Sequence, residues 1–192
     1  MKELIFATAN PNKVREVNDL LAEYHVKSLK DIGCEEEIPE TSPTIEGNAL
    51  QKAQYVKKHY QLDCFSEDTG LEIEALNGEP GVITAHYAGP QRSAEDNMNL
   101  VLSKLANTKN RNARFKTIIA LILNGETHLF EGIVNGQIAT QKSGEKGFGY
   151  DPIFIPDGYE TSFAEMNAEE KNKISHRARA IAKLKDFLVN LH

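Results

Sequence analysis

The pattern of apolar and polar positions predicts a strand, a turn and a helix at the start of the chain. An apolar run over 4–7 leads into a polar turn, and apolar residues then recur at the spacing of an amphipathic helix, at Val14, Val17 and Leu21. Asn10 is a suitable N-cap, and Pro11 fits the first helical position because the N–H that it lacks would have no partner there. The helix is therefore expected to begin directly after the turn.

Two further helices and a strand are predicted in the rest of the first half. One helix spans 45–60 and has an apolar stripe at Ala49, Ala53 and Val56. The other follows Ser93 and Asp96, which are spaced as in a capping box. Between the two helices, 62–66 is typical of a short buried strand that ends in Glu67-Asp68-Thr69-Gly70.

The second half is dominated by strand patterns. Strands over 115–123 and 128–134 are separated by Asn124-Gly125, a strong signal for a type I′ hairpin turn. Asn135-Gly136 predicts a second turn before a strand at 137–140. The last predicted elements are a short strand at 153–156 and a helical region that buries Ile174, Ala178, Ile181, Leu184 and Leu188. Because alternating helices and strands precede antiparallel hairpins, we expect an α/β fold with a mixed sheet covered by helices.

Length and composition favour one domain over 1–192. The 192 residues suffice for one well-buried core, and 40% hydrophobic with 26% charged residues is ordinary for a globular protein. The N-terminal apolar run is too short for a signal peptide or a membrane span, so we expect a cytoplasmic protein without a membrane partner. Cys34 and Cys64 have neither metal-site spacing nor the density of a disulfide scaffold, which suggests two buried or inert thiols.

The formal charge of −6 argues against a protein that coats nucleic acid, because such binding depends on many Lys and Arg contacts to phosphates. A small anionic substrate remains compatible with this charge. A nucleoside triphosphate needs only a few local cations and a divalent metal held by carboxylates.

The strand, turn and helix at the N-terminus resemble a phosphate-binding arrangement but contain no glycine. Neither a Walker loop nor a dinucleotide-binding turn matches the stretch from Thr8 to Lys13. Lys13 lies in the first helical turn, where the helix dipole disfavours a cation by some tenths of a kcal/mol. It is either a solvated surface lysine or a ligand of an anion that binds at the same place.

Three other stretches carry candidate chemistry, and each also has an ordinary structural interpretation. Asp68 at a strand end is suited to Mg²⁺, with Glu40 as a second ligand, although an Asx-turn is the alternative. Two glycines flank Phe148, so its ring could stack on a purine or fill a tight turn. Ser175-His176-Arg177 marks a helix start, with Lys171 four residues earlier.

Together these motifs resemble the inosine/xanthosine triphosphate pyrophosphatase family, which removes noncanonical purine nucleotides and includes HAM1-like and RdgB-like proteins. The resemblance covers essentially the whole chain and rests on Thr8-x-x-Asn-x-Lys13, Glu67-Asp68-Thr69-Gly70-Leu71, Pro80-Gly81-Val82, Gly147-Phe148-Gly149-Tyr150-Asp151-Pro152, Lys171 and Ser175-His176-Arg177. It implies a long curved mixed sheet with two α/β lobes and the substrate in the cleft between them. It also implies a homodimer and Mg²⁺-dependent conversion of a (d)NTP and water to a (d)NMP and pyrophosphate.

The resemblance also implies a role for each matched residue. Glu40 and Asp68 would bind the metal, and Asp68 would also be the base for the attacking water. Phosphates would be bound by Thr8, Ala9, Asn10, Pro11, Asn12 and Lys13, with added positive charge from Lys52 and Lys171. Thr69 would touch the substrate, and the base would be held by Phe148, Gly149, Tyr150, Asp151, His176 and Arg177.

One departure from the family pattern is visible after the Pro80-Gly81 turn. Many bacterial relatives have Ser-Ala-Arg-Tyr where this chain has Thr84-Ala85-His86-Tyr87. A histidine with an ordinary pKa of about 6.5 is not equivalent to an arginine at neutral pH. His86 is therefore not assigned to the site.

Two competing interpretations concern the same kind of fold. A Maf-like nucleotide pyrophosphatase would make the same products from other bases, but its serine- and arginine-rich opening does not match Thr8-x-x-Asn-x-Lys13. A catalytically silent nucleotide-binding module is the other. Glu40 and Asp68 argue against it, because a binder needs no carboxylate that activates water beside a metal.

Overall fold

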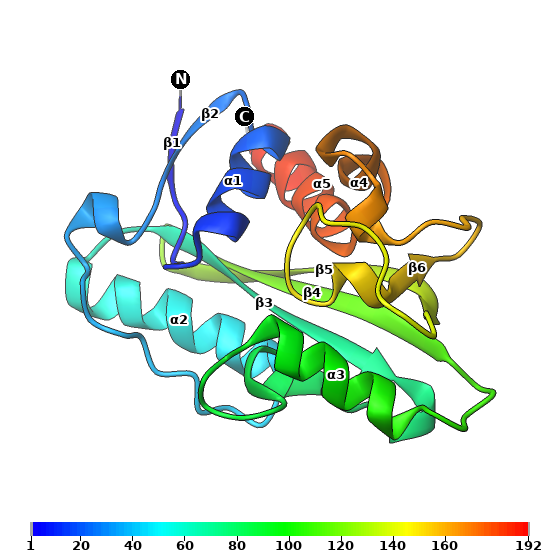
Figure 1. Ribbon diagram of the computed structural model, residues 1–192. Helices are drawn as coiled ribbons and strands as arrows, with labels where there is room; N and C mark the ends of the chain where they lie inside the picture. The colour runs from blue at the N-terminus through cyan, green and yellow to red at the C-terminus, as the bar shows by residue number, and fades with distance from the viewer. Residues whose placement is uncertain (1, 192) are drawn as a thin grey trace. The chain divides into compact units, whose positions relative to one another are not determined.

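Five α-helices and six strands make up the regular structure of the computed structural model, which describes residues 2–191 (Figure 1). The helices are α1 (Pro11–Leu20), α2 (Ile45–Tyr60), α3 (Ala94–Lys104), α4 (Ala168–Ile174) and α5 (His176–Val189). The strands are β1 (Lys2–Ile5), β2 (Tyr24–Lys27), β3 (Cys64–Ile73), β4 (Asn112–Leu123), β5 (Glu126–Ile138) and β6 (Phe154–Pro156). None of the helices within 2–191 has the length and apolar character needed to cross a membrane.

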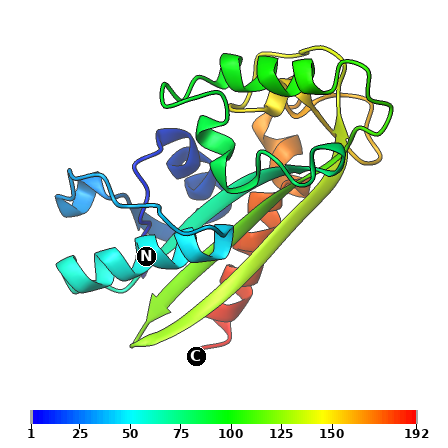
Figure 2. The same ribbon diagram turned by 90° about the horizontal axis from the view of Figure 1, so that it is seen from below.

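The strands form two sheets with both parallel and antiparallel pairing. β1 pairs with β2 in parallel, and a four-stranded sheet has the order β3-β4-β5-β6, in which β5 and β6 are antiparallel. Figure 2 shows β4 and β5 running side by side from the turn that joins them. The predicted α/β class, a mixed sheet flanked by helices, is confirmed.

The chain divides into two compact units. Unit 1 comprises 1–68, 117–132 and 177–192, and unit 2 comprises 69–116 and 133–176. Each of the strands β3, β4 and β5 passes from one unit into the other along its length. The expectation of one domain over 1–192 stays a prediction.

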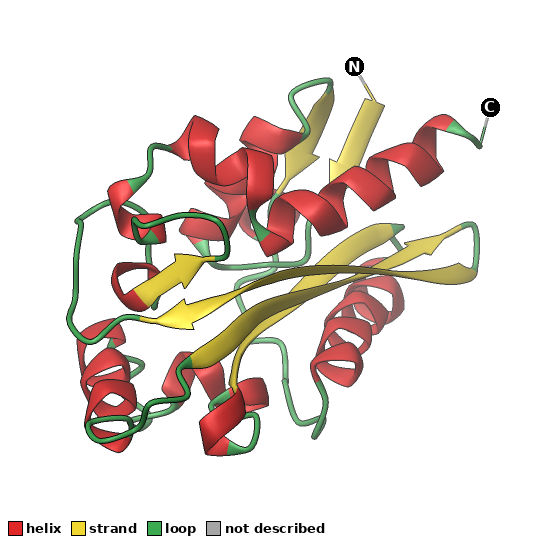
Figure 3. Cartoon of the chain, turned by 90° about the vertical axis from the view of Figure 1, so that its right-hand side faces the viewer, coloured by secondary structure: helices red, strands yellow, loops and turns green. Residues whose placement is uncertain are grey.

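Unit 1 has a core on each face of its strands. Successive residues of β4 point to opposite faces, so Ile118, Ala120 and Ile122 join a cluster with α2. Ile119 and Leu121 join a second cluster with α1 and α5. Figure 3 shows helices on both sides of these strands. Because both faces are covered, the strand is apolar at consecutive positions instead of alternating.

Unit 2 has one core, formed by α3 and the adjoining parts of β3, β4 and β5. Its aromatic centre is Phe115, whose ring centroid lies 4.6 Å from that of Phe154 and 6.2 Å from that of Phe163. These rings pack the short strand β6 and the segment before α4 against the sheet.

Several local predictions are confirmed. The side-chain oxygen of Asn10 caps α1, accepting from the amides of Asn12 at 2.9 Å and Lys13 at 3.4 Å. The bounds of α2 are the predicted ones. Asn124 and Gly125 have φ values of 51° and 83°, the left-handed pair that a type I′ turn requires.

Two predictions about strands are wrong. β3 does not end before Glu67 but continues to Ile73, because Leu71 and Ile73 are buried in the core of unit 2 and extend the strand. Asn135-Gly136 is no turn but lies inside β5, where Gly136 pairs with Pro156. A Cβ at Gly136 would lie 2.3 Å from the carbonyl oxygen of Ile155, so close strand approach explains this glycine.

Candidate active site

The turn after β1 is held next to β3 in unit 1. Phe6 forms a parallel bridge with Phe65, and their rings stack with centroids 4.6 Å apart. The amide of Ala7 donates to the carbonyl of Phe65 over 2.8 Å. Since Phe65 is followed within three residues by Glu67 and Asp68, these contacts place the turn beside both carboxylates.

The turn itself is a stiff helix start built without glycine. Thr8 is buried, and its hydroxyl accepts the amide of Asn10 over 3.2 Å. The Asn10 side chain then caps α1, whose first residue is Pro11. Side-chain hydrogen bonds and proline thus fix a backbone that glycine would leave flexible.

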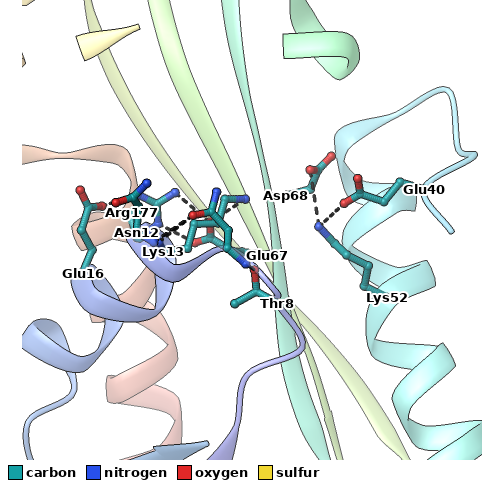
Figure 4. A network of polar contacts seen from close by, with 10 residues as sticks. Thr8, Asn12, Lys13, Glu16, Glu40, Lys52, Glu67, Asp68 and Arg177 are labelled. Atoms are coloured by element: carbon teal, nitrogen blue, oxygen red, sulfur yellow. Dashed lines mark hydrogen bonds and ion pairs between the residues drawn. The ribbon is translucent and has the colours of Figure 1, made fainter. Parts of the chain in front are cut away.

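Glu67 and Asp68 are neighbours on β3 and therefore point to opposite faces of the strand (Figure 4). Glu67 lies on the side of α1 and α5, where Lys13 approaches to 3.1 Å. Asp68 lies on the side of α2, where Lys52 approaches to 3.7 Å. The two carboxylates thus belong to different clusters within unit 1.

On the first side, Glu67 and Arg177 form a buried ion pair with two hydrogen bonds of 2.8 Å each. A third nitrogen of Arg177 donates to Glu16. Burial lowers the pKa of Lys13. Burial alone would also disfavour the charged forms of Glu67 and Arg177. Glu67 and Glu16 outweigh burial and hold the pKa of Arg177 above its ordinary value. Arg177 and Lys13 likewise hold the pKa of Glu67 far below its ordinary value. Glu67 and Arg177 therefore both remain charged.

On the second side, Lys52 joins two carboxylates. Its Nζ lies 2.5 Å from Oε1 of Glu40 and 3.7 Å from Oδ1 of Asp68. Burial raises the pKa of Asp68, although Lys52 opposes this effect. The other oxygen of Asp68, Oδ2, is buried and has no hydrogen-bond partner within 2–191.

This arrangement fits a magnesium ion. Mg²⁺ prefers oxygen ligands and is usually held by one or two carboxylates together with water and substrate phosphates. Glu40 and Asp68 supply that number, and the unpaired oxygen of Asp68 is a buried acceptor that a cation would satisfy. Within 2–191 no group of three or more His, Cys, Asp and Glu side chains lies so that it could hold a metal ion.

A second group of predicted residues comes together in unit 2. One carboxylate oxygen of Asp151 accepts the amide of Phe148 over 3.0 Å and Nζ of Lys171 over 2.7 Å. The same Nζ lies 5.0 Å from the centroid of the Phe148 ring. Gly147 has φ +70°, and a Cβ there would lie 2.1 Å from the Asp151 carboxylate, so this turn requires glycine.

Two neighbours complete the surroundings of this turn. The hydroxyl of Tyr150 donates to the carbonyl of Thr84 over 2.7 Å, which ties the turn to the 3-10 segment η3 (Gly81–His86). His176, the first residue of α5, is 3% exposed and stacks on Phe115 with centroids 4.7 Å apart. His86 is exposed within η3.

The predicted site residues therefore fall into two sets. Unit 1 holds Thr8, Ala9, Asn10, Pro11, Asn12, Lys13, Glu40, Lys52, Asp68 and Arg177, and unit 2 holds Thr69, Phe148, Gly149, Tyr150, Asp151, Lys171 and His176. Their roles toward a substrate stay predictions. The sequence interpretation did not include Glu67 and Glu16 in the site. One available signal was the spacing of Glu16, which follows Lys13 by one helical turn on the buried side of α1.

Comparisons with known proteins match this chain to one family over nearly its full length. The model of the Ham1 family matches residues 4–187. A dITP/XTP pyrophosphatase of Flavobacterium psychrophilum is 53% identical, over 98% of this chain and 100% of the relative. A dITP/XTP pyrophosphatase of Bacillus subtilis is 47% identical, over 98% of each chain. The solved structure of the Staphylococcus aureus Ham1 protein has a TM-score of 0.90 and 38% identity, covering 100% of both chains.

Proposed function

This chain belongs to the Ham1 family, and we propose on that basis that it is a pyrophosphatase of noncanonical purine nucleoside triphosphates. The substrates would be ITP, dITP and XTP, and the products the nucleoside monophosphate and pyrophosphate. Similarity to dITP/XTP pyrophosphatases over nearly the full chain supports this substrate class. The reaction would remove deaminated purines from the nucleotide pool.

The observation that carries the proposal is the state of Asp68. Its carboxylate is buried, its pKa is raised by that burial, and its Oδ2 has no hydrogen-bond partner among the described residues. A base whose pKa is raised toward the working pH accepts a proton from water more effectively. Asp68 would accept that proton as water attacks the linkage between the α and β phosphates.

The other charged residues of unit 1 would bind the triphosphate and metal. Thr8 to Lys13 offer a hydroxyl, backbone amides at a helix start and an ammonium group. Lys52 lies against the carboxylates of Glu40 and Asp68, which would hold Mg²⁺. When bound, Mg²⁺ neutralises negative charge on the phosphates. No covalent intermediate is needed.

Base selection follows from hydrogen-bond patterns. Hypoxanthine and xanthine present an acceptor at O6 and a donor at N1, whereas adenine presents the reverse. Adenine would leave unpaired a donor such as Arg177 and an acceptor such as Asp151 or a nearby carbonyl. Unpaired groups of this kind can favour hypoxanthine or xanthine over adenine by about 10⁴ or more in kcat/KM. Guanine shares O6 and N1–H, so its exclusion must depend on the 2-amino group. Phe148, with His176, would hold the ring, and Lys171 would add positive charge.

We further propose that the enzyme requires Mg²⁺, is a homodimer and acts in the cytoplasm without nucleic-acid or membrane partners. Two carboxylates with one unpaired oxygen support the metal. The acidic composition, with a formal charge of −6, supports a small substrate over a nucleic acid. Light scattering of the purified protein tests the dimer.

One assay separates this function from its rivals. The protein is incubated with Mg²⁺ and each of ITP, dITP, XTP, ATP, GTP, dTTP and UTP, and pyrophosphate and orthophosphate are both measured. Pyrophosphate from ITP, dITP and XTP, with little from the other nucleotides, is the expected result. Pyrophosphate mainly from dTTP or UTP would favour a Maf-like enzyme, and the absence of product would favour a silent binding module.

A further inference from the structure

The segment that carries Glu40 is fastened along α2. We call residues 34–43 the Glu40 segment; it has no regular secondary structure and lies in unit 1. At its start, Glu36 accepts the hydroxyl of Tyr60 over 2.8 Å and that of Tyr55 over 3.0 Å. At its end, the amide of Ser42 donates to Asn48 over 2.8 Å. The segment therefore runs antiparallel to the helix and is attached near both of its own ends.

The contact next to Glu40 is a reciprocal pair. Gln51 accepts the backbone amide of Thr41 over 2.8 Å and donates to the Thr41 hydroxyl over 2.9 Å. One side-chain amide thus fixes both the backbone and the side chain of the residue that follows Glu40. Gln51 also precedes Lys52, the residue that binds the Glu40 carboxylate.

These contacts come from one face of the helix. Gln51 follows Asn48 by three residues and Lys52 follows it by four, and Tyr55 follows Gln51 by four, the spacing of neighbours along a helix surface. α2 is a rigid element that is buried against β4 through the adjoining apolar stripe. A segment attached to this face at several points therefore holds its own side chains in register with those of the helix.

We propose that Gln51 is a positioning residue for Glu40, which it holds in place for metal binding through Thr41. This inference rests on the proposed function, in which Glu40 binds Mg²⁺. A carboxylate that releases Lys52 to bind a cation needs a backbone that is held independently of Lys52. The Gln51–Thr41 pair supplies that attachment, because neither of its two hydrogen bonds involves a charged group.

The test compares two alanine substitutions on the same helix. Gln51→Ala removes the pair, and Gln54→Ala is the matched control, since Gln54 is exposed three residues later and has no side-chain hydrogen bond within 2–191. Thr41→Val removes only the hydroxyl and keeps the amide. Glu40→Gln tests the metal assignment itself.

Three measurements are made on each full-length variant. Hydrogen exchange at the Thr41 amide reports the attachment directly, Mn²⁺ binding followed by electron paramagnetic resonance gives the metal Kd without turnover, and kcat is measured at saturating Mg²⁺. For Gln51→Ala we expect faster exchange and a Kd raised about tenfold, at the lower end of outer-shell effects, with kcat within about twofold. Thr41→Val should show a smaller rise, and Gln54→Ala none.

Faster exchange in Gln51→Ala with an unchanged Mn²⁺ Kd would overturn the positioning role and leave the proposed function intact. An unchanged Kd in Glu40→Gln would instead remove Glu40 from the metal site, and the inference about Gln51 with it. A raised Kd in Gln54→Ala equal to that in Gln51→Ala would show a general effect of the helix surface and would also refute the proposal. Thermal unfolding of each variant confirms that the compared proteins are folded.

Discussion

Replacing Arg177 by methionine is expected to destabilise the protein strongly at neutral pH. The guanidinium of Arg177 donates to Glu67 and Glu16, and the residue is 1% exposed. Methionine keeps a long side chain but has neither the positive charge nor the donors. Among residues 2–191, Glu67 would keep Lys13, at 3.1 Å, as its remaining ion-pair partner at a position where it is 1% exposed. Breaking a buried ion pair by removing one partner costs about 3–5 kcal/mol, and we expect a loss in that range.

The loss should depend on pH in a defined direction. In the wild type the pKa of Glu67 is lowered on folding, so its stabilisation is complete above the pKa of the unfolded chain and is lost as pH falls through the folded pKa. Without Arg177 the pKa of Glu67 rises, and protonation removes the uncompensated charge. Because the unfolded chain titrates alike in both proteins, the difference in unfolding free energy between variant and wild type should shrink as pH falls through the raised folded-state pKa of Glu67 in the variant.

Urea unfolding at several pH values measures this difference. The double variant Glu67→Gln/Arg177→Met lacks the buried carboxylate charge and should recover a large part of the loss at neutral pH. Arg179→Met is the control on the same helix, because Arg179 is exposed and its replacement should change stability by about 0.5 kcal/mol or less. A loss below about 1 kcal/mol in Arg177→Met, or one independent of pH, would refute the compensating role of Arg177.

Three further outcomes follow from the same geometry. Asp68→Asn should lower kcat by several orders of magnitude in the pyrophosphate assay, and near-normal turnover would exclude Asp68 as the base. Arg177→Ala, assayed at a temperature where it is folded, should raise the KM for ITP and reduce the ratio of kcat/KM for ITP to that for ATP. An unchanged ratio would show that Arg177 does not recognise the base. Gly136→Ala should lower the free energy of unfolding by about 1–3 kcal/mol in thermal or urea unfolding, because the added Cβ would lie 2.3 Å from the carbonyl oxygen of Ile155. A variant as stable as the wild type would show that β6 moves aside.

Local chemistry explains which features could be predicted from the sequence. The Asn10 cap, the bounds of α2 and the Asn124-Gly125 turn depend on residues within a few positions of one another, so their signals are complete in the sequence. Asn135-Gly136 carries the same turn signal, but its conformation is decided by Pro156, which pairs with Gly136 from a distant strand. A pattern alone cannot distinguish a glycine needed for a turn from one needed for close approach.

The candidate site shows the same division. The residues of the site could be proposed from motifs, but not their partners, because Arg177 is 161 positions from Glu16 and 110 from Glu67. Glu67 stood beside Asp68 in the predicted motif, but only Asp68 was given a role. Once β3 is known to continue, alternation of side chains determines that Glu67 and Asp68 face different helices.

Placing two adjacent acids on one strand gives each a different environment and therefore a different task. Glu67 is paired with two cations, Lys13 and Arg177, and its pKa is lowered so far that it stays charged and is too weak a base to accept a proton from water. Asp68 is paired at 3.7 Å with Lys52, which Glu40 shares at 2.5 Å, and burial outweighs the attraction of Lys52 and Lys13, so the pKa of Asp68 is raised. Glu67, which is fully paired, holds Lys13 and α5 in place. Asp68, which is incompletely paired, is the carboxylate suited to accept a proton and to bind a metal ion.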